Sequence, residues 1–182
     1  LISAGIVTCP FFEIFTTDMD LTLIFYFRLI VKLLSSGVKP EQKLSPIFAS
    51  NGLLCSVDWV KRELERGNDY LAQWAKKVFA RWFDSTADKD IVECYGEVMN
   101  WVNRQRQFYD WAKRDFASGA DGWLLAYAMV RNKVVVTQEQ FKANLKNKVP
   151  LPNVCRAFEV DHIDSFTMLR ELGVRLVGFE TP

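Results

Sequence analysis

The sequence is poor in the side chains that most often bind transition metals. Its 182 residues include one histidine, His162, and four widely spaced cysteines that form no Cys-x-x-Cys motif: Cys9, Cys55, Cys94 and Cys155. This scarcity argues against a zinc knuckle and a multi-histidine metal site, and a Ser-His-Asp triad would depend on His162 alone. The cysteine pattern fits the reduced thiols of a cytoplasmic protein. A bound metal ion would have carboxylate ligands, which favours Mg²⁺ or Mn²⁺.

The chain also lacks a strong overall charge and a long hydrophobic run. Its formal net charge of +1 gives no global electrostatic reason to bind nucleic acid. Local basic clusters such as Lys61-Arg62 and Lys113-Arg114 can form a phosphate-binding face, although a solvated helix face is the commoner explanation. Arg28 and Lys32 interrupt the apolar run over residues 21–34, which is short for a membrane span. We therefore expect no membrane segment and no signal peptide.

A helix and a strand in the second half of the chain organise the expected fold. Four residues share one face of the predicted helix: Asp121, Leu124, Leu125 and Ala128. This face is apolar except for Asp121, and a buried charge requires a partner. The Val-Val-Val stretch over 134–136 predicts a buried strand, and Thr137 and Glu139 follow its carboxyl end, where ligands bind in parallel α/β sheets. We therefore expect Asp121 and Glu139 to converge at one sheet edge.

Each acid also has a simpler explanation. Asp121 can be an ordinary acid in a first helical turn, favoured by the helix dipole. Glu139 can belong to a predicted helix over 138–146, and Glu63 can be a solvated acid beside Lys61 and Arg62. The combined pattern, an acid that opens a buried helix followed by Val-Val-Thr-x-Glu, favours a shared site.

Strands alternate with helices over residues 51–182, which predicts one α/β domain with a short, mainly parallel sheet. The predicted strands are 53–55, 133–137, 153–156 and 174–178. The predicted helices are 57–66, 70–83, 91–103, 105–117 and 166–172, with Ser56 as the N-cap of the first and Asp164 or Ser165 as that of the last. Aromatic residues at helical spacing, among them six tryptophans, are expected in the core, with base stacking open for one or two.

The order and spacing of several motifs resemble those of a PIN-like domain. The resemblance is closest to an uncharacterised PIN-like family that is regarded as toxins of toxin–antitoxin pairs. The motifs span roughly residues 51–179 and include Cys55-Ser56-Val57, Val60-Lys61-Arg62-Glu63-Leu64, Ala120-Asp121-x-Trp123-Leu124, Val135-Val136-Thr137-x-Glu139, Val149-Pro150-x-Pro152-Asn153-Val154-Cys155 and Met168-Leu169-Arg170-Glu171-Leu172-Gly173-Val174. The resemblance implies a three-layer α/β/α sandwich and a Mg²⁺- or Mn²⁺-dependent ribonuclease of the cytoplasm.

The resemblance also assigns residues and partners. It implies that Glu63, Asp121 and Glu139 are the catalytic metal ligands, which would support metal-assisted hydrolysis of an RNA phosphodiester. It implies that Thr137 positions a ligand or a phosphate. RNA and a cognate antitoxin are the implied partners, and a homodimer is left open.

Residues 1–50 depart from this resemblance. A PIN-like domain opens with a strand that ends in Asp-Thr-Asn, whose Asp is the first metal ligand, and this motif is absent. Codons can be chosen for residues 20–31 that encode Phe-Asp-Thr-Asn-Ile-Leu in a shifted reading frame. We therefore hypothesise that the chain before about Asn51 is read out of frame, although the apolar, β-prone stretch Leu21–Phe27 can still replace the lost strand.

Two other interpretations remain. One is an inactive PIN-like module that binds a protein partner. The other is a truncated or mistranslated product without a function.

Overall fold

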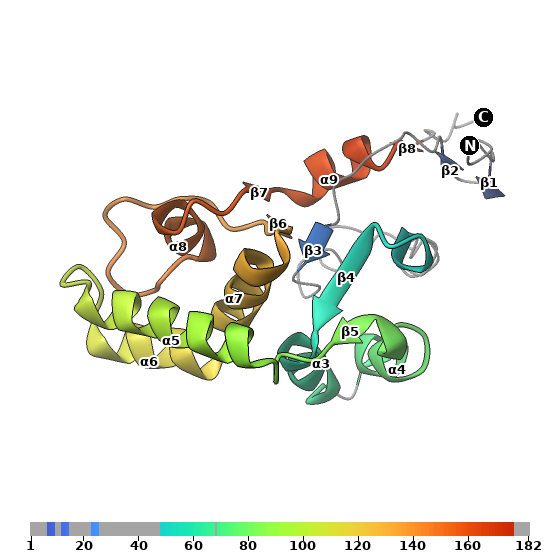
Figure 1. Cartoon of the computed structure of the whole chain (residues 1–182). Coiled ribbons are helices and arrows are strands. Elements are labelled where there is room, and N and C mark those ends of the chain that lie inside the picture. The colour runs from blue at the N-terminus through green and yellow to red at the C-terminus, as the bar shows by residue number, and fades with distance from the viewer. Residues whose placement is uncertain (1–6, 10–11, 15–22, 26–47, 68, 177–182) are drawn as a thin grey trace.

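The computed structural model describes residues 7–9, 12–14, 23–25, 48–67 and 69–176, and they form a mixed α/β fold in which helices predominate (Figure 1). The helices are α3 (Asp58–Glu65), α4 (Tyr70–Lys77), η1 (Ala80–Trp82), α5 (Lys89–Arg104), α6 (Asp110–Ser118), α7 (Asp121–Arg131), α8 (Leu151–Ala157) and α9 (Ser165–Glu171). The strands are β1 (Val7–Cys9), β2 (Phe12–Ile14), β3 (Leu23–Phe25), β4 (Leu54–Val57), β5 (Phe83–Asp84), β6 (Val134–Val136), β7 (His162–Ile163) and β8 (Val174–Leu176). Within these described ranges, no helix combines the length and the apolar character needed to cross a membrane.

A short parallel sheet lies at the centre of the fold, with the strand order β5-β4-β3-β6-β7. Two small parallel pairs, β4 with β5 and β6 with β7, are joined by β3, which lies parallel to both β4 and β6. The next two strands along the chain, β4 and β5, lie on one side of β3, and the following two, β6 and β7, lie on its other side. The crevice between the carboxyl ends of β3 and β6 is therefore a topological switch point, the usual place for a ligand in such sheets.

The predicted α/β class and the parallel pairing are confirmed. Strand β6 is fully buried, with Val134, Val135 and Val136 exposed by 9%, 0% and 1%, as expected for β-branched residues in a central strand. The strand expected within residues 21–27 is present as β3, and its register places Ile24 beside Cys55 and Val135. The other predictions for residues 1–50, including how the stretch packs, lie outside the described residues.

Three local predictions are wrong, and the helix predicted over 70–83 ends at Lys77, before η1 and β5. Residues 153–156 lie in α8 rather than in a strand, because Pro152 occupies the first turn of that helix, where the missing N–H costs nothing. Residues 138–146 contain no helix. Ser56 is buried in β4, and Val57 precedes α3 as an N-cap without a side-chain hydrogen bond.

The sheet also differs from the prediction at its margins. Strand β8 pairs antiparallel with β2 in a separate three-stranded sheet, although it was predicted for the main sheet. The edge strands β5 and β7 were missed, because two residues are too few to show an alternating pattern.

Helix α7 connects the sheet with the helical layer. It packs against β3, β4 and β6 on one side and along α5 on the other (Figure 1). A Cβ atom on Gly122 would lie 2.9 Å from Cε of Met99 and 3.0 Å from Cε2 of Tyr95, so a larger residue at this position would require these two side chains of α5 to shift. The close packing fixes the first turn of α7, which begins with Asp121.

Candidate functional site

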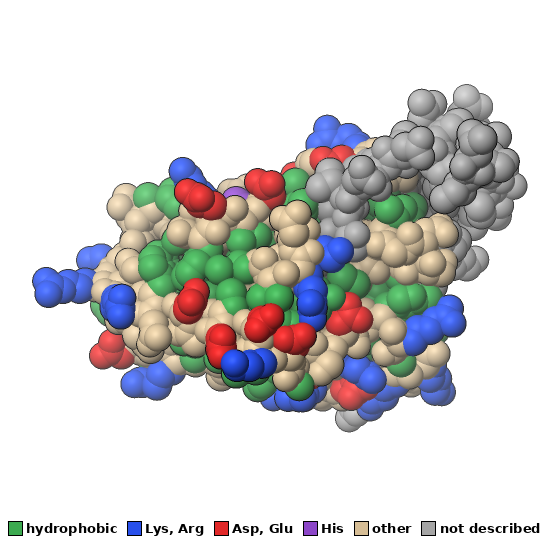
Figure 2. All heavy atoms as spheres, in the orientation of Figure 1, with side chains coloured by type: hydrophobic (Ala, Val, Ile, Leu, Met, Phe, Trp, Pro, Cys, Tyr) green, Lys and Arg blue, Asp and Glu red, His purple; other side chains and the backbone are tan. Residues whose placement is uncertain are grey.

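The predicted acids Glu63, Asp121 and Glu139 lie on three elements that meet at the carboxyl edge of the parallel sheet. Helix α3 follows β4, so its first turns lie at this edge, and α7 precedes β6, so it begins there too. Glu139 comes shortly after the end of β6. On the face drawn in Figure 2, acidic side chains gather near the centre, beside an apolar surface.

Glu63 is held against the start of α7. Its Oε1 atom accepts a hydrogen bond from the backbone N–H of Ala120 at 2.8 Å, and a Cβ atom on Gly119 would lie 3.4 Å from the same oxygen. Ala120 is 1% exposed and caps α7 without any side-chain hydrogen bond of its own. The Glu63 carboxylate therefore satisfies a buried donor at the positive end of the α7 dipole.

The electrostatics of Asp121 show that the three acids influence one another. Burial, reinforced by the negative charges of Glu139 and Glu63, raises the pKa of Asp121 from its usual 3.8 to about 7. The ammonium group of Lys148 acts in the opposite direction, and Asp115 raises the pKa a little further. Among the described residues, none donates a hydrogen bond to the Asp121 carboxylate.

Glu139 is oriented by its own turn and by the start of α8. Its Oε2 atom accepts a hydrogen bond from the backbone N–H of Leu151 at 2.9 Å, and Oε1 accepts one from Nζ of Lys148. The hydroxyl of Thr137, which is 6% exposed, accepts a hydrogen bond from the Glu139 backbone N–H at 3.1 Å. Thr137 therefore stabilises the turn that presents Glu139, and its role toward a substrate stays a prediction.

A complete metal site is not assembled in the part of the chain that the structure describes. No three His, Cys, Asp or Glu side chains in these ranges are grouped closely enough to hold a metal ion. Glu63 and Glu139 are instead turned onto the backbone N–H groups of Ala120 and Leu151. The acids thus reach one edge of the sheet and share their electrostatic field, and their role as ligands of Mg²⁺ or Mn²⁺ stays a prediction.

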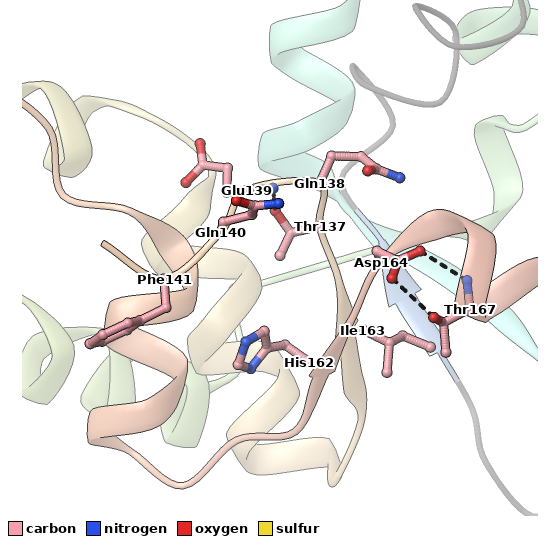
Figure 3. Close-up of a pocket in the computed structure, with 9 residues that line it drawn as sticks. All are labelled: Thr137, Gln138, Glu139, Gln140, Phe141, His162, Ile163, Asp164 and Thr167. Atoms are coloured by element: carbon pink, nitrogen blue, oxygen red, sulfur yellow. Dashed lines mark hydrogen bonds between the residues drawn. The ribbon is translucent and has the colours of Figure 1, made fainter. Parts of the chain in front are cut away.

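Beside the acids, a pocket of about 460 Å³ opens at the carboxyl ends of β6 and β7 (Figure 3). Its walls are formed by Thr137, Gln138, Glu139, Gln140, Phe141, His162, Ile163, Asp164 and Thr167. Glu139 is the predicted metal ligand that also lines this pocket. Nε2 of Gln138 is buried and has no hydrogen-bond partner among the described residues. The pocket was not predicted, because β7, which carries His162, shows no strand pattern in the sequence.

The three cysteines whose side chains are described, Cys55, Cys94 and Cys155, form no disulfide bond. Burial raises the pKa of Cys55 to about 11 and that of Cys155 to about 12. Because the thiolate is the reactive form of cysteine, a raised pKa disfavours a nucleophilic role for these two thiols at neutral pH.

Trp59 and Trp123 form a stack that joins three helices near the acids. The ring of Trp123 lies 5.1 Å from that of Trp59 and 3.8 Å from that of Tyr95, with nearly parallel planes. The guanidinium of Arg62 covers Trp59 at 4.8 Å from its centroid. The prediction of a packing role for the tryptophans is confirmed for this pair, whereas Trp111 is 52% exposed.

Comparison with known families gives one match. No curated protein is similar enough to this chain to count as a recognisable relative. The profile of a domain of unknown function, DUF4411, matches residues 44–176, which include all three acids and Thr137 and leave out β3. Because this match covers most of the sequence, the chain belongs to the DUF4411 family.

Proposed function

We propose that this chain has a PIN-like three-layer α/β/α fold and is a Mg²⁺- or Mn²⁺-dependent endoribonuclease, acting as a toxin that a cognate antitoxin neutralises. One observation carries the proposal: three acids lie near the switch point at the carboxyl edge of the sheet, and two of them influence the charge of the third. Asp121 begins α7, Glu63 is bonded to the residue before it, and Glu139 follows β6. Ligands of doubly wound α/β sheets bind in that crevice.

The donor atoms suit a hard divalent cation. All three side chains are carboxylates, and Mg²⁺ commonly keeps several waters while binding only one or two protein carboxylates. In both Glu63 and Glu139, one carboxylate oxygen accepts a hydrogen bond from a backbone N–H. A carboxylate has about four lone pairs, so such a bond does not prevent it from binding a cation. Asp121 gains most from a cation, because its negative charge is opposed by burial and by two neighbouring acids.

The proposed reaction is hydrolysis of an RNA phosphodiester. When bound, the cation supplies positive charge that activates a nucleophilic water and offsets the charge of the phosphate. Asp121 and Glu139 accept hydrogen bonds that orient the water, and Thr137 holds the Glu139 backbone in place. Lys148, which neighbours both acids, offers a cationic group to the phosphate.

A thermal melt with and without Mn²⁺ tests the metal site. We expect Mn²⁺ to raise the Tm of the wild-type chain by mass action and to leave the Tm of Asp121→Asn nearly unchanged. Asp115→Asn is the matched control, because it removes a nearby exposed acid that is no proposed ligand. Equal Mn²⁺ shifts in the wild type and in Asp121→Asn would remove Asp121 from the site.

RNA cleavage separates the enzyme from the second candidate, an inactive PIN-like module that binds a protein partner. The absent Asp-Thr-Asn motif favours this second candidate. RNA is incubated with the chain and Mn²⁺, and the products are separated on a denaturing gel. Metal-dependent fragments that disappear in Asp121→Asn support the enzyme, whereas Mn²⁺ binding without cleavage supports the inactive module.

A further inference from the structure

The pocket at the ends of β6 and β7 has a chemistry that differs from that of the neighbouring acids. Its lining contains amide, hydroxyl, imidazole and phenyl groups, and its charged residues are the acids Glu139 and Asp164. Among the residues that the structure describes, no lysine or arginine lines it. A phosphate group would therefore be repelled, and an uncharged ring with polar edges is the better ligand.

The charged groups of the pocket are already engaged, which leaves neutral groups to contact a ligand. The Asp164 carboxylate accepts hydrogen bonds from the backbone N–H groups of Phe166 and Thr167, and these bonds hold its pKa below the usual value. Glu139 is bonded to Lys148 and Leu151. The Gln140 amide and the His162 imidazole also line the pocket, and they are polar groups that a ligand can contact.

An aromatic surface lies on one side of the pocket. Phe141 is 44% exposed, and the guanidinium of Arg156 lies 4.2 Å from its ring centroid. In Figure 3, the rings of Phe141 and His162 both lie below the Gln140 amide. A planar ring that enters the pocket can stack on Phe141 and form hydrogen bonds with the imidazole and amide groups.

We propose that this pocket binds a nucleobase of single-stranded RNA, while the adjoining phosphate lies beside the divalent cation that Glu63, Asp121 and Glu139 hold in the proposed function. The inference rests on the proposed function and adds a base subsite to it. Glu139 links the pocket to the acids, because it lines the pocket and its negative charge also raises the pKa of Asp121. A nucleotide bound across Glu139 would place its base on the polar, aromatic side and its phosphate on the acidic side.

His162 provides a direct probe of the pocket. It is the only histidine in the chain, so its imidazole C–H signals in a proton NMR spectrum are unique. Short homopolymeric 2′-O-methyl oligoribonucleotides are added at fixed pH in the presence of Mg²⁺, and binding is followed in parallel by fluorescence anisotropy. We expect saturable shifts of the His162 signals that differ in size among the bases.

A pair of phenylalanine variants separates the pocket from the rest of the surface. Phe141→Ala is expected to weaken oligonucleotide binding about tenfold, the typical loss of one base–aromatic stack. Phe166→Ala is the control, because Phe166 is similarly exposed, at 49%, and does not line the pocket. Both side chains are exposed, so both variants should melt near the wild-type Tm.

The outcomes distinguish this inference from the proposed function. Oligonucleotide binding with unmoved His162 signals and an unchanged affinity in Phe141→Ala would overturn the base subsite and leave the metal-dependent nuclease standing. Binding that Phe141→Ala and Phe166→Ala weaken equally would overturn it as well. Failure of every oligonucleotide to bind would overturn the subsite, and the Mn²⁺ melt then decides separately on the acids.

Discussion

The carboxylate of Glu63 caps a helix to which it does not belong, because its Oε1 atom accepts the Ala120 backbone N–H at 2.8 Å, at the start of α7. Removing this carboxylate leaves the buried backbone N–H of Ala120 without its hydrogen-bond acceptor. We expect Glu63→Ala to lower the free energy of unfolding by about 1–3 kcal/mol and Glu63→Gln to lower it less, since the amide oxygen can still accept the bond. Urea denaturation measures both, with Glu65→Ala as a control on the same helix. Equal losses in Glu63→Ala and Glu65→Ala would contradict the capping role.

Asp121 makes stability depend on pH in a defined direction. Its pKa is raised from 3.8 to about 7 on folding, so its contribution lowers the stability of the wild type as pH rises from about 4 to about 7. We expect Asp121→Asn to be more stable than the wild type by about 2 kcal/mol above pH 7, since Asp121 keeps some exposure and water screens part of the penalty. Below about pH 4 the difference should vanish. Urea denaturation over this pH range, without divalent metal, measures the stability of both proteins. A difference between Asp121→Asn and the wild type that stays constant with pH would contradict the raised pKa of Asp121.

Lys148 opposes the raised pKa of Asp121 and bonds to Glu139. Replacing it in Lys148→Met removes the positive charge and should raise the pKa of Asp121 further. The stability difference caused by Asp121→Asn should then still begin near pH 4, but it should become larger and level off at a higher pH. The comparison is made between Lys148→Met and the double variant that also carries Asp121→Asn. Lys142→Met, which removes an exposed lysine of the same loop, should leave the pH range unchanged.

Asn153 fixes the loop over residues 137–150 that carries Glu139. Its side chain accepts a hydrogen bond from the backbone N–H of Lys142 and donates one to the Lys142 carbonyl, both at 2.9 Å. We expect Asn153→Ala to lower the free energy of unfolding by about 2 kcal/mol and to speed tryptic cleavage in this loop, because two partly buried bonds are lost. Asn147→Ala, an exposed change in the same loop, is the control. Equal cleavage rates in the two variants would show that Asn153 does not restrain the loop.

The parts of the site that were predictable depend on local sequence patterns. The run Val134–Val136 predicted a central strand because β-branched residues suit a strand that is buried on both faces. The spacing of Asp121 and Leu125 placed an acid on the buried face of α7. Asp164, one of the two predicted N-cap candidates, caps α9, because an N-cap acts within one turn of the chain.

The parts that were missed depend on contacts between distant segments. The cap that Glu63 provides joins α3 to α7, and no spacing within either helix indicates it. The predicted helix over 138–146 does not form, since Asn153 binds the Lys142 backbone and Gln107 binds the Leu145 carbonyl. Tertiary hydrogen bonds there override the local preference for a helix.

The position of β3 between β4 and β6 has a consequence for the order of folding. Its partners Leu54 and Val134 lie in different halves of the chain, and the DUF4411 match begins after β3. On the ribosome, β3 emerges well before β6, so its second edge stays unpaired until β6 has been synthesised. Such long-range pairing requires the closure of a large loop and slows folding. The nascent chain therefore carries an open strand edge while the residues between β3 and β6 are synthesised, and a chaperone or a partner chain has access to it at this stage.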